Sequence, residues 1–434
     1  ANGLSGNVVV SDAIDVPQNF PITGFERIKF KLASPGLSED KGRYYDFESH
    51  PMYVYKISDR HEVTPKTQAY TLNFCSREVI RNEQVRVSQA FTGQSASMFA
   101  ELMHNELYIN CKKPVFIESD KENWKYVVPS IHPFDAINRI CQQTRPNKGN
   151  YGGSHPGYVF YETAAGYHFQ SLESHLITPS GELTAPQATF ASSISNIALD
   201  KRSTDGSISH IQTEMGTIKE YKLVSQFDII KAIKAGVATA KTLTHDSFNK
   251  LFKDDGEQHE FSYHKDYEKY NHLEPQTVGK SKGMLLPVTP YDSGRLISKM
   301  HDSVKYFVST TKKRHNNNEN APAEDVLARK VSYRNAFDTI KVEFEVPGYT
   351  GLAVGEVVKL NLKNIMDEDK QYIKNFVNGR YLVSSIRHQV SRSIEHHSMI
   401  IEGIKDSLSG ALPESLSNNW SEKDEKGQII TKLI

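Results

Sequence analysis

Apolar and polar residues alternate with a period of two near both ends of the chain. The clearest alternating stretches are residues 27–32, 71–74, 340–346 and 355–362. A period of two predicts β-strands that bury one face and expose the other. The turn signals Pro347-Gly348 and Asn378-Gly379 separate the C-terminal strands at regular spacing. This spacing favours a small antiparallel barrel or meander in that part of the chain.

A hairpin pattern near the start of the chain returns near its end. In the first copy a strand leads into Arg60-His61-Glu62-Val63, and a second strand follows after a polar gap. In the second copy a strand leads into Arg387-His388-Gln389-Val390, and again a second strand follows. The offset is constant, because 387 − 60 and 397 − 70 both equal 327. The pattern predicts two similar β-modules, with a chance match as the alternative. A module present twice lets a ring contain twice as many blocks as subunits.

Apolar residues with helical spacing occur between the two strand-rich ends. They predict helices at residues 98–106, 133–141, 226–233 and 322–340. A hairpin is predicted at 157–172, with its turn at Ala165-Gly166, and the β-branched run 236–244 favours a strand. The low-complexity segment 315–320 predicts an exposed loop, and the polar segment from residue 407 onward predicts an extended tail.

The length of 434 residues is too great for one ordinary hydrophobic core. The predicted fold class is α+β, mainly β, with two similar antiparallel β-barrels and α/β accessory insertions. The predicted regions are residues 1–110 (first barrel with a flanking helix), 111–195 (α/β accessory domain), 196–250 with 322–408 (second barrel), 251–321 (polar insertion) and 409–434 (extended C-terminal tail).

Charge is balanced along the chain, with 52 Lys and Arg against 52 Asp and Glu. This balance argues against a global nucleic-acid or membrane footprint and leaves local patches open. No apolar run approaches the length of a membrane span, and the first residues lack the features of a secretory signal. Cys75, Cys111 and Cys141 have no metal-type spacing, which predicts buried free thiols in a reducing compartment.

Three stretches contain a more specific pattern. They are residues 133–140 with 157–173, residues 226–237, and residues 333–335 with the four C-terminal strands. The residues that mark the pattern are Phe134, Asp135, Phe160, Phe169, Phe227, Asp228, Tyr333, Arg334, Pro347, Gly348 and Gly379. Through these stretches the chain resembles the baseplate central hub subunit of T-even-like contractile-tailed bacteriophages.

The resemblance implies two tube-type β-barrels per subunit and a homotrimer whose six barrels form a pseudo-sixfold ring. Such a ring adapts a hexameric tail tube to a trimeric spike and lines the channel for genome ejection. The implied partners are a tail spike or lysozyme-type hub protein, a tail tube or tube-initiator protein, baseplate wedge proteins and a tape-measure protein. The implied location is the virion tail baseplate, assembled in the host cytoplasm. DNA passes only transiently and non-specifically, and no cofactor and no membrane are implied.

Signatures of catalysis are missing from the sequence, which contains no G-x-S-x-G elbow, phosphate loop or H-E-x-x-H motif. The histidines considered as metal ligands are His259, His264, His272, His396 and His397. Neighbours on a strand point to opposite faces, so His396 and His397 do not readily bind one ion. Surface histidines are the preferred interpretation, and Gly149–Gly153 and Asp367–Asp369 are interpreted as loops. We therefore predict no catalytic, cofactor-binding or metal-binding residues.

A structural, non-enzymatic hub is the preferred function. One alternative is a cell-wall hydrolase that uses Glu162 or His168 of the middle domain. A second alternative is a receptor- or glycan-binding tail module, which the 21 tyrosines motivate. A trimer that binds a spike protein distinguishes the hub from both alternatives, because neither of them requires a ring.

Overall fold

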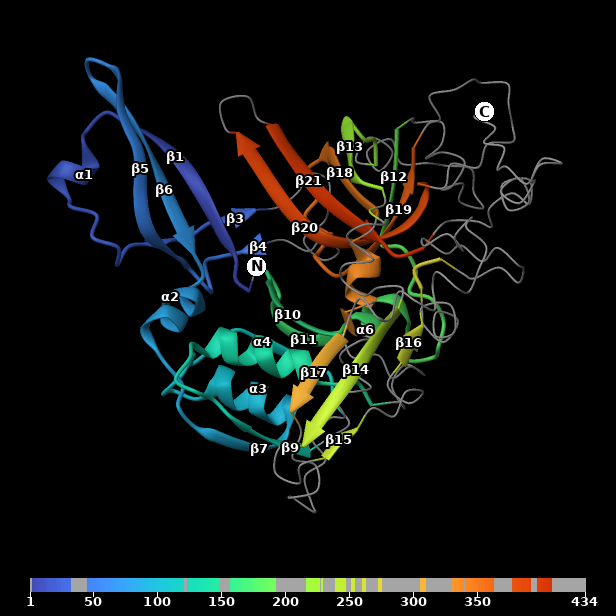
Figure 1. The fold of residues 1–434 in the computed structure, drawn as a ribbon. Helices are drawn as coiled ribbons and strands as arrows, with labels where there is room; N and C mark the ends of the chain where they lie inside the picture. The colour runs from blue at the N-terminus through green and yellow to red at the C-terminus, as the bar shows by residue number, and fades with distance from the viewer. Residues whose placement is uncertain are drawn as a thin grey trace, which may run out of the picture. The chain divides into compact units, whose positions relative to one another are not determined.

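Figure 1 shows the fold of the chain in a computed structural model. The structure describes residues 2–32, 45–120, 123–147, 157–192, 216–226, 228, 239–246, 251–253, 260–262, 272–274, 305–309, 330–331, 333–338, 340–362, 377–391 and 396–407. The chain divides into two compact units, Ala1–Thr144 with Tyr158–Gln170 and Arg145–Gly157 with Ser171–Ile434. Each unit has its own sheets and its own buried core.

The first unit begins with a four-stranded antiparallel sheet. Its N-terminal elements are β1 (Ser5–Asp12), α1 (Val16–Asn19), β2 (Arg27–Ile28), β3 (Lys31–Leu32), β4 (Tyr45–Asp46), β5 (Met52–Thr64) and β6 (Thr67–Cys75). The sheet has the order β1-β6-β5-β2, and β3 pairs with β4 in a separate ribbon. β5 and β6 form the long hairpin that the sequence predicts, with its turn at Pro65-Lys66.

The predicted strand over residues 27–32 is interrupted in the structure, where β2 and β3 are separate. The ring of Phe30 lies between them and packs against Phe47 and Phe74, with centroid distances of 4.6 and 5.8 Å. Aromatic packing of this kind stabilises more than the weak strand preference of a short segment. The prediction of one continuous strand was therefore wrong at Phe30.

A helical layer and two small sheets complete the first unit. Its further elements are α2 (Arg77–Gln84), β7 (Ala90–Gln94), α3 (Ser95–His104), β8 (Val115–Ile117), β9 (Asn123–Val127), α4 (Pro133–Gln143), β10 (Tyr158–Thr163) and β11 (Gly166–Ser171). The helix α4 begins with proline, which has a suitable φ and no donor to lose at a first helical turn. Apolar residues of α3 and α4 meet β10 and β11 in one core. The predicted helices at 98–106 and 133–141 and the hairpin at 157–172 are confirmed.

The second unit contains a six-stranded sheet. Its strands are β12 (Ala188–Ala191), β13 (Glu220–Ser225), β18 (Ile340–Pro347), β19 (Val357–Asn361), β20 (Gly379–Ser391) and β21 (His396–Lys405). They follow the order β12-β19-β20-β21-β18-β13. Strands β18 to β21 are the four C-terminal strands that the alternating pattern predicts, and all three pairs among them are antiparallel.

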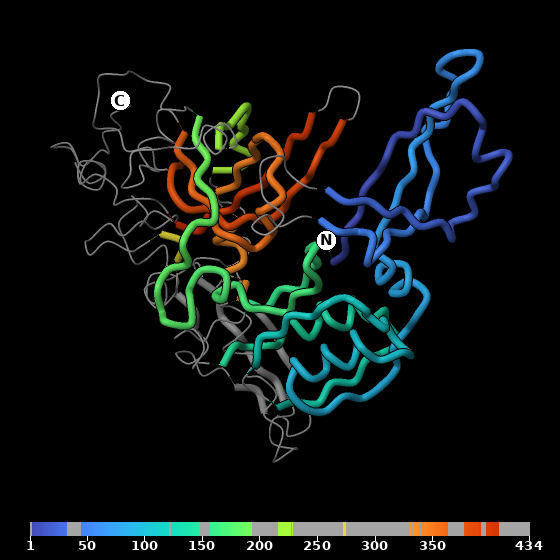
Figure 2. Tube along the Cα trace, turned by 180° about the vertical axis from the view of Figure 1, so that it is seen from behind, coloured from blue at the N-terminus to red at the C-terminus, as the bar shows by residue number. Residues whose placement is uncertain are grey.

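The two ends of this sheet meet through the segment that enters β13. Ala191 of β12 bridges to Thr217, and the N–H of Ile218 donates to the Ala191 carbonyl at 2.9 Å. The N–H of Lys219 then donates to the Glu345 carbonyl of β18 at 2.9 Å. One short segment therefore contacts both β12 and β18, and the sheet curls around its core. Figure 2 shows these strands from behind, with the green β12 among the orange and red strands.

The remaining elements of the second unit test the other predictions for this region. They are α6 (Leu172–Leu176), β14 (Thr239–Asp246), β15 (Leu251–Lys253), β16 (Glu260–Ser262) and β17 (Lys305–Ser309). β14 confirms the predicted strand over 236–244 with shifted bounds, and it pairs with β15, β16 and β17. Residues 333–337 are helical, within the helix predicted at 322–340. Apart from Gln226 and Asp228, the helix at 226–233 lies outside the described residues, as do the loop at 315–320 and the tail from 409.

Four strands of the first unit repeat in the second unit with the same connectivity. The order β1-β6-β5-β2 corresponds to β18-β21-β20-β19, because in both units the first strand pairs with the fourth, the fourth with the third and the third with the second. The register also repeats. Val54 pairs with Phe74 and Val383 with Gly403, so both strands are offset by 329 (383 − 54 and 403 − 74). The repeated hairpin predicted from the sequence is thus a repeated sheet.

A β-bulge lies at the same place in both hairpins. In β5 the pairing shifts between Val54 and Lys56, and in β20 it shifts between Val383 and Ser385. The extra residues are Tyr55 and Ser384. A bulge increases strand twist and is usually retained as a feature of the fold. Its recurrence argues strongly against the chance match that the sequence left open.

The offset of 327 that the sequence indicates is wrong for most of the hairpin and holds only at Thr64 and Ser391, next to the turn. Further irregularities in β5 between Ser58 and Thr64 change the offset along this strand, so that Thr64 corresponds to Ser391 (391 − 64 equals 327). β6 and β21 keep the offset of 329 throughout, and Tyr70 therefore corresponds to Met399. Within the matched residues, His61 and Glu62 correspond to Gln389 and Val390, an offset of 328, so the sequence match located the repeat but not its register.

Candidate functional site

Each of the two long hairpins, with the side chains that anchor it, is a candidate functional site within its own unit. In β5 the inner residues Met52 and Val54 are buried, whereas Val63 near the turn is 57% exposed. In β20 the inner residue Tyr381 is fully buried, whereas Val390 is 61% exposed. Each hairpin therefore has a packed base and an outer end at which a valine is exposed.

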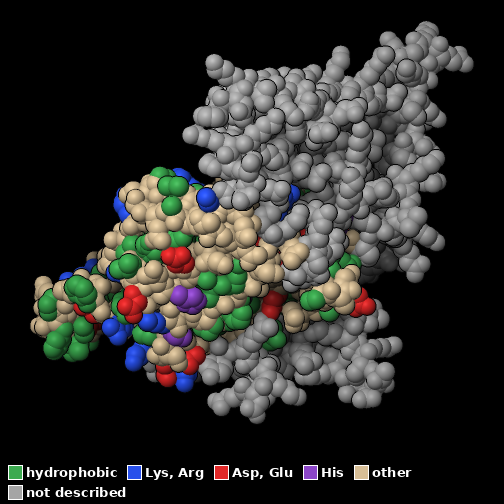
Figure 3. Space-filling model, turned by 90° about the horizontal axis from the view of Figure 1, so that it is seen from below, with side chains coloured by type: hydrophobic (Ala, Val, Ile, Leu, Met, Phe, Trp, Pro, Cys, Tyr) green, Lys and Arg blue, Asp and Glu red, His purple; other side chains and the backbone are tan. Residues whose placement is uncertain are grey.

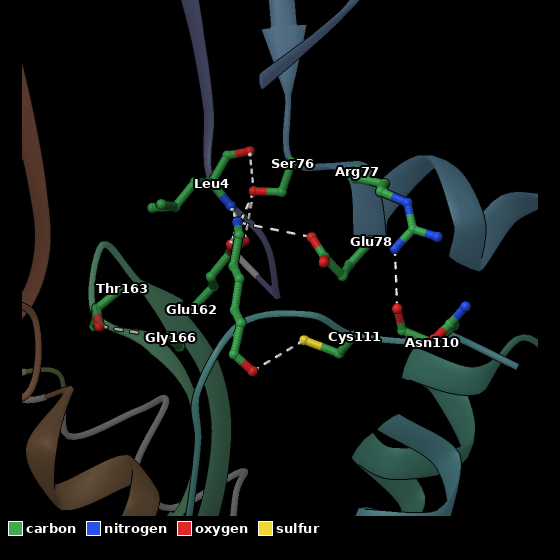
Figure 4. A network of polar contacts seen from close by, with 10 residues as sticks. Leu4, Ser76, Arg77, Glu78, Asn110, Cys111, Glu162, Thr163 and Gly166 are labelled. Atoms are coloured by element: carbon green, nitrogen blue, oxygen red, sulfur yellow. Dashed lines mark hydrogen bonds and ion pairs between the residues drawn. The ribbon is translucent and has the colours of Figure 1, made fainter. Parts of the chain in front are cut away.

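A buried ionic cluster lies at the base of the first hairpin, immediately after β6 (Figure 4). The carboxylate of Glu162 on β10 accepts hydrogen bonds from Ser76 Oγ at 2.7 Å and from the Leu4 N–H at 2.7 Å, and it pairs with Lys113. Lys113 Nζ also lies 3.7 Å from Glu78 Oε2 on α2. This cluster ties the start of β1, the end of β6 and α2 to the sheet of β10 and β11.

The cluster holds two carboxylates against one ammonium group in a nearly dry environment. The side chains of Glu162, Glu78 and Lys113 are 0%, 2% and 7% exposed. Burial, with the Glu162 charge adding to it, raises the pKa of the Cys75 thiol to about 11. Burial likewise raises the pKa of Cys111 to about 12, and the nearby Glu78 charge acts in the same direction. All three cysteines are buried free thiols, as predicted.

A second buried ion pair lies at the base of the second hairpin. Lys405, at the end of β21, is wholly buried and pairs with Glu274 at 3.2 Å. Its Nζ also donates to the Asn378 carbonyl at 2.7 Å, and the Arg380 N–H donates to Glu274 at 2.6 Å. Burial lowers the pKa of Lys405, against the opposing effect of the Glu274 charge. Lys405 occupies the position that Ser76 has in the first unit (405 − 76 equals 329), so both hairpins end on a buried glutamate.

The segment that supplies Glu274 is fixed by neighbouring polar contacts. His272 Nδ1 lies 2.8 Å from Asp406 Oδ2, and the Leu273 N–H donates to the same carboxylate at 3.2 Å. The Glu274 N–H donates to Ser407 Oγ at 3.2 Å. His272 was considered as a surface histidine from the sequence, and this interpretation was wrong because the side chain is buried against Asp406.

Two histidines meet on the second hairpin. His388 Nδ1 of β20 and His397 Nε2 of β21 are 3.2 Å apart. Burial lowers the pKa of His388 to about 4, and the neighbouring His397 contributes in the same direction. Burial also lowers the pKa of His397. His396, on the opposite face, lies 3.3 Å from Lys219 Nζ. The two neighbours therefore have different surroundings, as the alternation of a strand requires.

Three of the residues that mark the sequence pattern lie in one aromatic cluster of the first unit. Phe134 and Phe160 pack at 5.2 Å, and both Phe160 and Phe169 pack against Phe99, at 5.6 and 4.6 Å. Asp135 lies exposed in the first turn of α4, where a carboxylate interacts favourably with the helix N-terminus. These positions account for the residue types through aromatic packing and through a favourable charge at the N-terminus of α4.

The other marking residues lie in the second unit. Tyr333 is buried against Phe337 at 5.1 Å, Arg334 is exposed and Pro347 ends β18 opposite Ser398. Asp228 is exposed, and Phe227 lies outside the described residues. Gly348 and Gly379 lie where a neighbouring side chain leaves no space for a Cβ atom.

A Cβ atom at Gly348 would lie 2.1 Å from the His397 ring. Gly379 has φ of +119°, and a Cβ there would lie 2.0 Å from Glu274 Oε1. Both glycines therefore leave room for a side chain that reaches the hairpin from another strand or segment.

The residues proposed for hydrolysis have structural surroundings. Glu162 is fully buried in the ionic cluster, with no exposed carboxylate surface to offer a substrate. His168 is stacked between Phe116 and Tyr161, with centroid distances of 4.7 and 4.8 Å, and its Nε2 lies 2.9 Å from Thr163 Oγ1. Among the described residues, no group of three or more His, Cys, Asp or Glu side chains could hold a metal ion. His259 and His264 lie outside that set.

Sequence reasoning missed the partners in both ionic clusters. Glu162 gives a signal in retrospect, because it follows Tyr158 and Phe160 at inward positions of an alternating strand. A carboxylate at such a position requires a buried partner. No comparable signal identifies Lys113 or Glu274 as that partner, since each is far from its hairpin in the sequence.

On the face drawn in Figure 3, the described Lys and Arg side chains lie among Asp and Glu side chains and form no continuous basic patch. Among the described residues, no helix has the length and apolar character needed to cross a bilayer.

No protein-family model and no curated protein sequence matches the chain. Similar solved structures include a tail protein from Neisseria meningitidis MC58, with a TM-score of 0.45, 10% identity and 94% of each chain covered. A 43 kDa tail protein of prophage MuSo2 from Shewanella oneidensis has a TM-score of 0.42, 8% identity and coverage of 94% of this chain and 95% of that one. An E. coli component of the type VI secretion system has a TM-score of 0.36, 6% identity and coverage of 89% and 71%. These values are too low to support an argument about function.

Proposed function

We propose that this chain is a structural subunit of a phage-type tail and that it forms the hub of the baseplate. In this proposal three copies close into a ring, and each copy contributes two related β-modules. The ring then presents six similar modules toward a hexameric tube and three identical surfaces toward a trimeric spike.

The repeated sheet is the observation that supports this proposal most directly. Strand order, pairing direction, register and the position of one bulge all recur between β1-β6-β5-β2 and β18-β21-β20-β19. An adaptor between threefold and sixfold partners needs two such similar sheets, because six similar contact surfaces must come from three chains.

The sequence resemblance to hub subunits supplies the identity of the partners. On this basis the chain binds a spike or lysozyme-type hub protein on one side and a tube or tube-initiator protein on the other. Wedge and tape-measure proteins, a contractile tail and a location in the virion baseplate belong to the same proposal. The proposal also includes the role that the family gives to the marking residues. It further includes the division of the chain into residues 1–110, 111–195, 196–250 with 322–408, 251–321 and 409–434.

The proposal includes a non-enzymatic role. The support for it lies in Glu162 and His168, the two residues considered for hydrolysis, since one is buried in an ionic cluster and the other is stacked between two aromatic rings. A channel for DNA also fits the balanced charge, because a dense basic lining would hold the polyanion through counterion release.

Light scattering and electron-microscopic class averages of the purified chain test the proposal. We expect the mass of a trimer and threefold rings with an open centre, either for the chain alone or with a spike protein bound. A monodisperse monomer at micromolar concentration that binds no spike protein contradicts the proposal. Lytic activity that is lost on substitution of Glu162 or His168 would instead support the hydrolase.

A further inference from the structure

The two repeated sheets differ at the edge formed by their first strands. In the second unit, β18 is covered by β13 over Lys341–Glu345. The corresponding stretch of β1 is Ser5–Val9, because Val8 pairs with Leu72 as Phe344 pairs with Ile401 (344 − 8 equals 336, and 401 − 72 equals 329). Among the described residues, no strand pairs with this outer edge of β1.

The open edge leaves apolar side chains in water. Val8 is 39% exposed, whereas Phe344 at the corresponding position is 1% exposed. Val9 is 68% exposed, and the corresponding residue of β18 is Glu345. The first unit thus has valine where the second unit has a charged residue on the same strand position.

The sequence of β1 lacks the devices that keep an edge strand from pairing. Residues Ser5 to Ser11 contain no charge and no proline, and Val8, Val9 and Val10 follow one another. Soluble proteins normally protect such an edge with lysine, proline or a covering segment, since its free N–H and C=O groups can pair with another strand. An uncharged edge with exposed valines can therefore accept another strand.

We infer that the outer edge of β1 at Ser5–Val9 receives an extended strand from a second copy of this chain, in antiparallel pairing. The inference rests on the proposed function, which requires that copies associate. The internal repeat provides the template, because β13 shows an antiparallel strand in place on the same edge of the related sheet.

A second copy suits this edge better than a charged partner does. The stretch Ser5–Val9 has no charge to complement, so apolar contact and main-chain hydrogen bonds determine the pairing. The chain itself has strands that expose apolar residues on both faces, such as β13 with Leu223 at 40% and Val224 at 47% exposure. In a closed ring every copy offers the same edge and every edge is covered.

The test compares Val9→Lys with Glu345→Lys. The two residues occupy corresponding positions, but β13 of the same chain already covers the strand that contains Glu345. We expect Glu345→Lys to keep the mass of the unmodified chain in sedimentation velocity. Val9→Lys should dissociate the assembly or weaken association by at least about tenfold, because an edge lysine opposes strand addition. An unchanged mass for Val9→Lys overturns the inference.

The outcome separates this inference from the proposed function. If the unmodified chain is a trimer and Val9→Lys is also a trimer, the hub stands and the role of β1 falls. If the unmodified chain is a dimer that Val9→Lys dissociates, the role of β1 stands and the threefold ring falls. A monomeric unmodified chain removes both.

Hydrogen exchange provides a measurement that needs no variant and so remains decisive if Val9→Lys fails to fold. Amides of Ser5–Val9 that face away from β6 should exchange at least about tenfold more slowly at concentrations where the chain associates than where it is dissociated. Equal exchange at both concentrations overturns the inference.

Discussion

The sheet of the first unit and the sheet of the second unit have the same strand connections but different degrees of completion. The second sheet includes β12 and β13, curls until its ends meet, and buries Val342, Phe344 and Ile401 almost completely. Among the described residues, the first sheet has its four repeated strands and no covering strand, and most of β1 is exposed. The comparison indicates that strand order and register are the same with and without covering strands. Side chains are less buried in the first sheet, which therefore exposes surface that a partner can contact.

The largest expected effect concerns the anchors of the two hairpins. Replacing Lys113 with Met leaves Glu162 and Glu78 buried without the lysine that pairs with them, and replacing Lys405 with Met removes the buried lysine that pairs with Glu274. Each change should lower the free energy of unfolding by about 3–5 kcal/mol, measured by urea denaturation.

Lys341→Met is the matched control, because this lysine pairs with Asp338 and Glu402 near the surface and should cost about 1 kcal/mol or less. If Lys113→Met cost no more than the control, the buried cluster would not be an anchor of the first hairpin.

The next effect concerns a glycine that only the second sheet requires. Gly379→Ala should destabilise by about 2–3 kcal/mol, because φ is +119° and the new Cβ meets Glu274. The corresponding residue of the first sheet is His50 (379 − 50 equals 329), which is not a glycine and is not among the residues with a positive φ.

The variant Gly181→Ala distinguishes backbone strain from a steric clash of the new Cβ atom. Gly181 also has a positive φ, +84°, but no atom lies within 4 Å of the built Cβ. Thermal unfolding should therefore show a smaller loss for Gly181→Ala, about 1 kcal/mol. Equal losses at both glycines would mean that the contact with Glu274 contributes nothing.

A smaller effect compares two valines at corresponding positions. Val346 is fully buried and Val10 is only half-buried (346 − 10 equals 336). Val346→Ala should cost about 2 kcal/mol and Val10→Ala less than about 1 kcal/mol in the dissociated chain. Chemical denaturation of both variants measures the difference. A cost for Val10→Ala as large as that for Val346→Ala would show that the first sheet is as well packed as the second.

The smallest effect is the pH dependence of the second hairpin. The pKa of His388 is lowered from 6.5 to about 4, so the unfolded chain binds more protons than the folded chain between these values. Stability should therefore be lost as pH falls from 6.5 toward 4.

His388→Gln removes this contribution, and its melting temperature should fall less over that pH range than that of the unmodified chain. Carboxylates that titrate in the same range act equally on both proteins. Parallel melting curves at every pH would contradict the assignment to His388.

The strands were predictable because a period of two marks a strand with one buried face, as at 340–346 and 355–362. The register of the repeat was not predictable from the matched residues, since two irregularities of β5 between Ser58 and Thr64 change the offset from 329 to 327 along this strand. An error of two residues also preserves the inward and outward faces, so the pattern alone could not reveal it. The interruption at Phe30 and the pairs Glu162–Lys113 and Glu274–Lys405 depend on distant contacts, which no local pattern encodes.

The recurring bulge also has a consequence for the side chains of the two hairpins. The bulges have Tyr55 and Ser384 as their extra residues and lie at corresponding positions of the two hairpins, although these residues share neither size nor polarity. A bend that is set by an extra residue does not depend on which side chain that residue bears. The surface residues of each hairpin can therefore differ while the bulge is kept, and exchanging the two hairpins in a chimera should preserve their curvature.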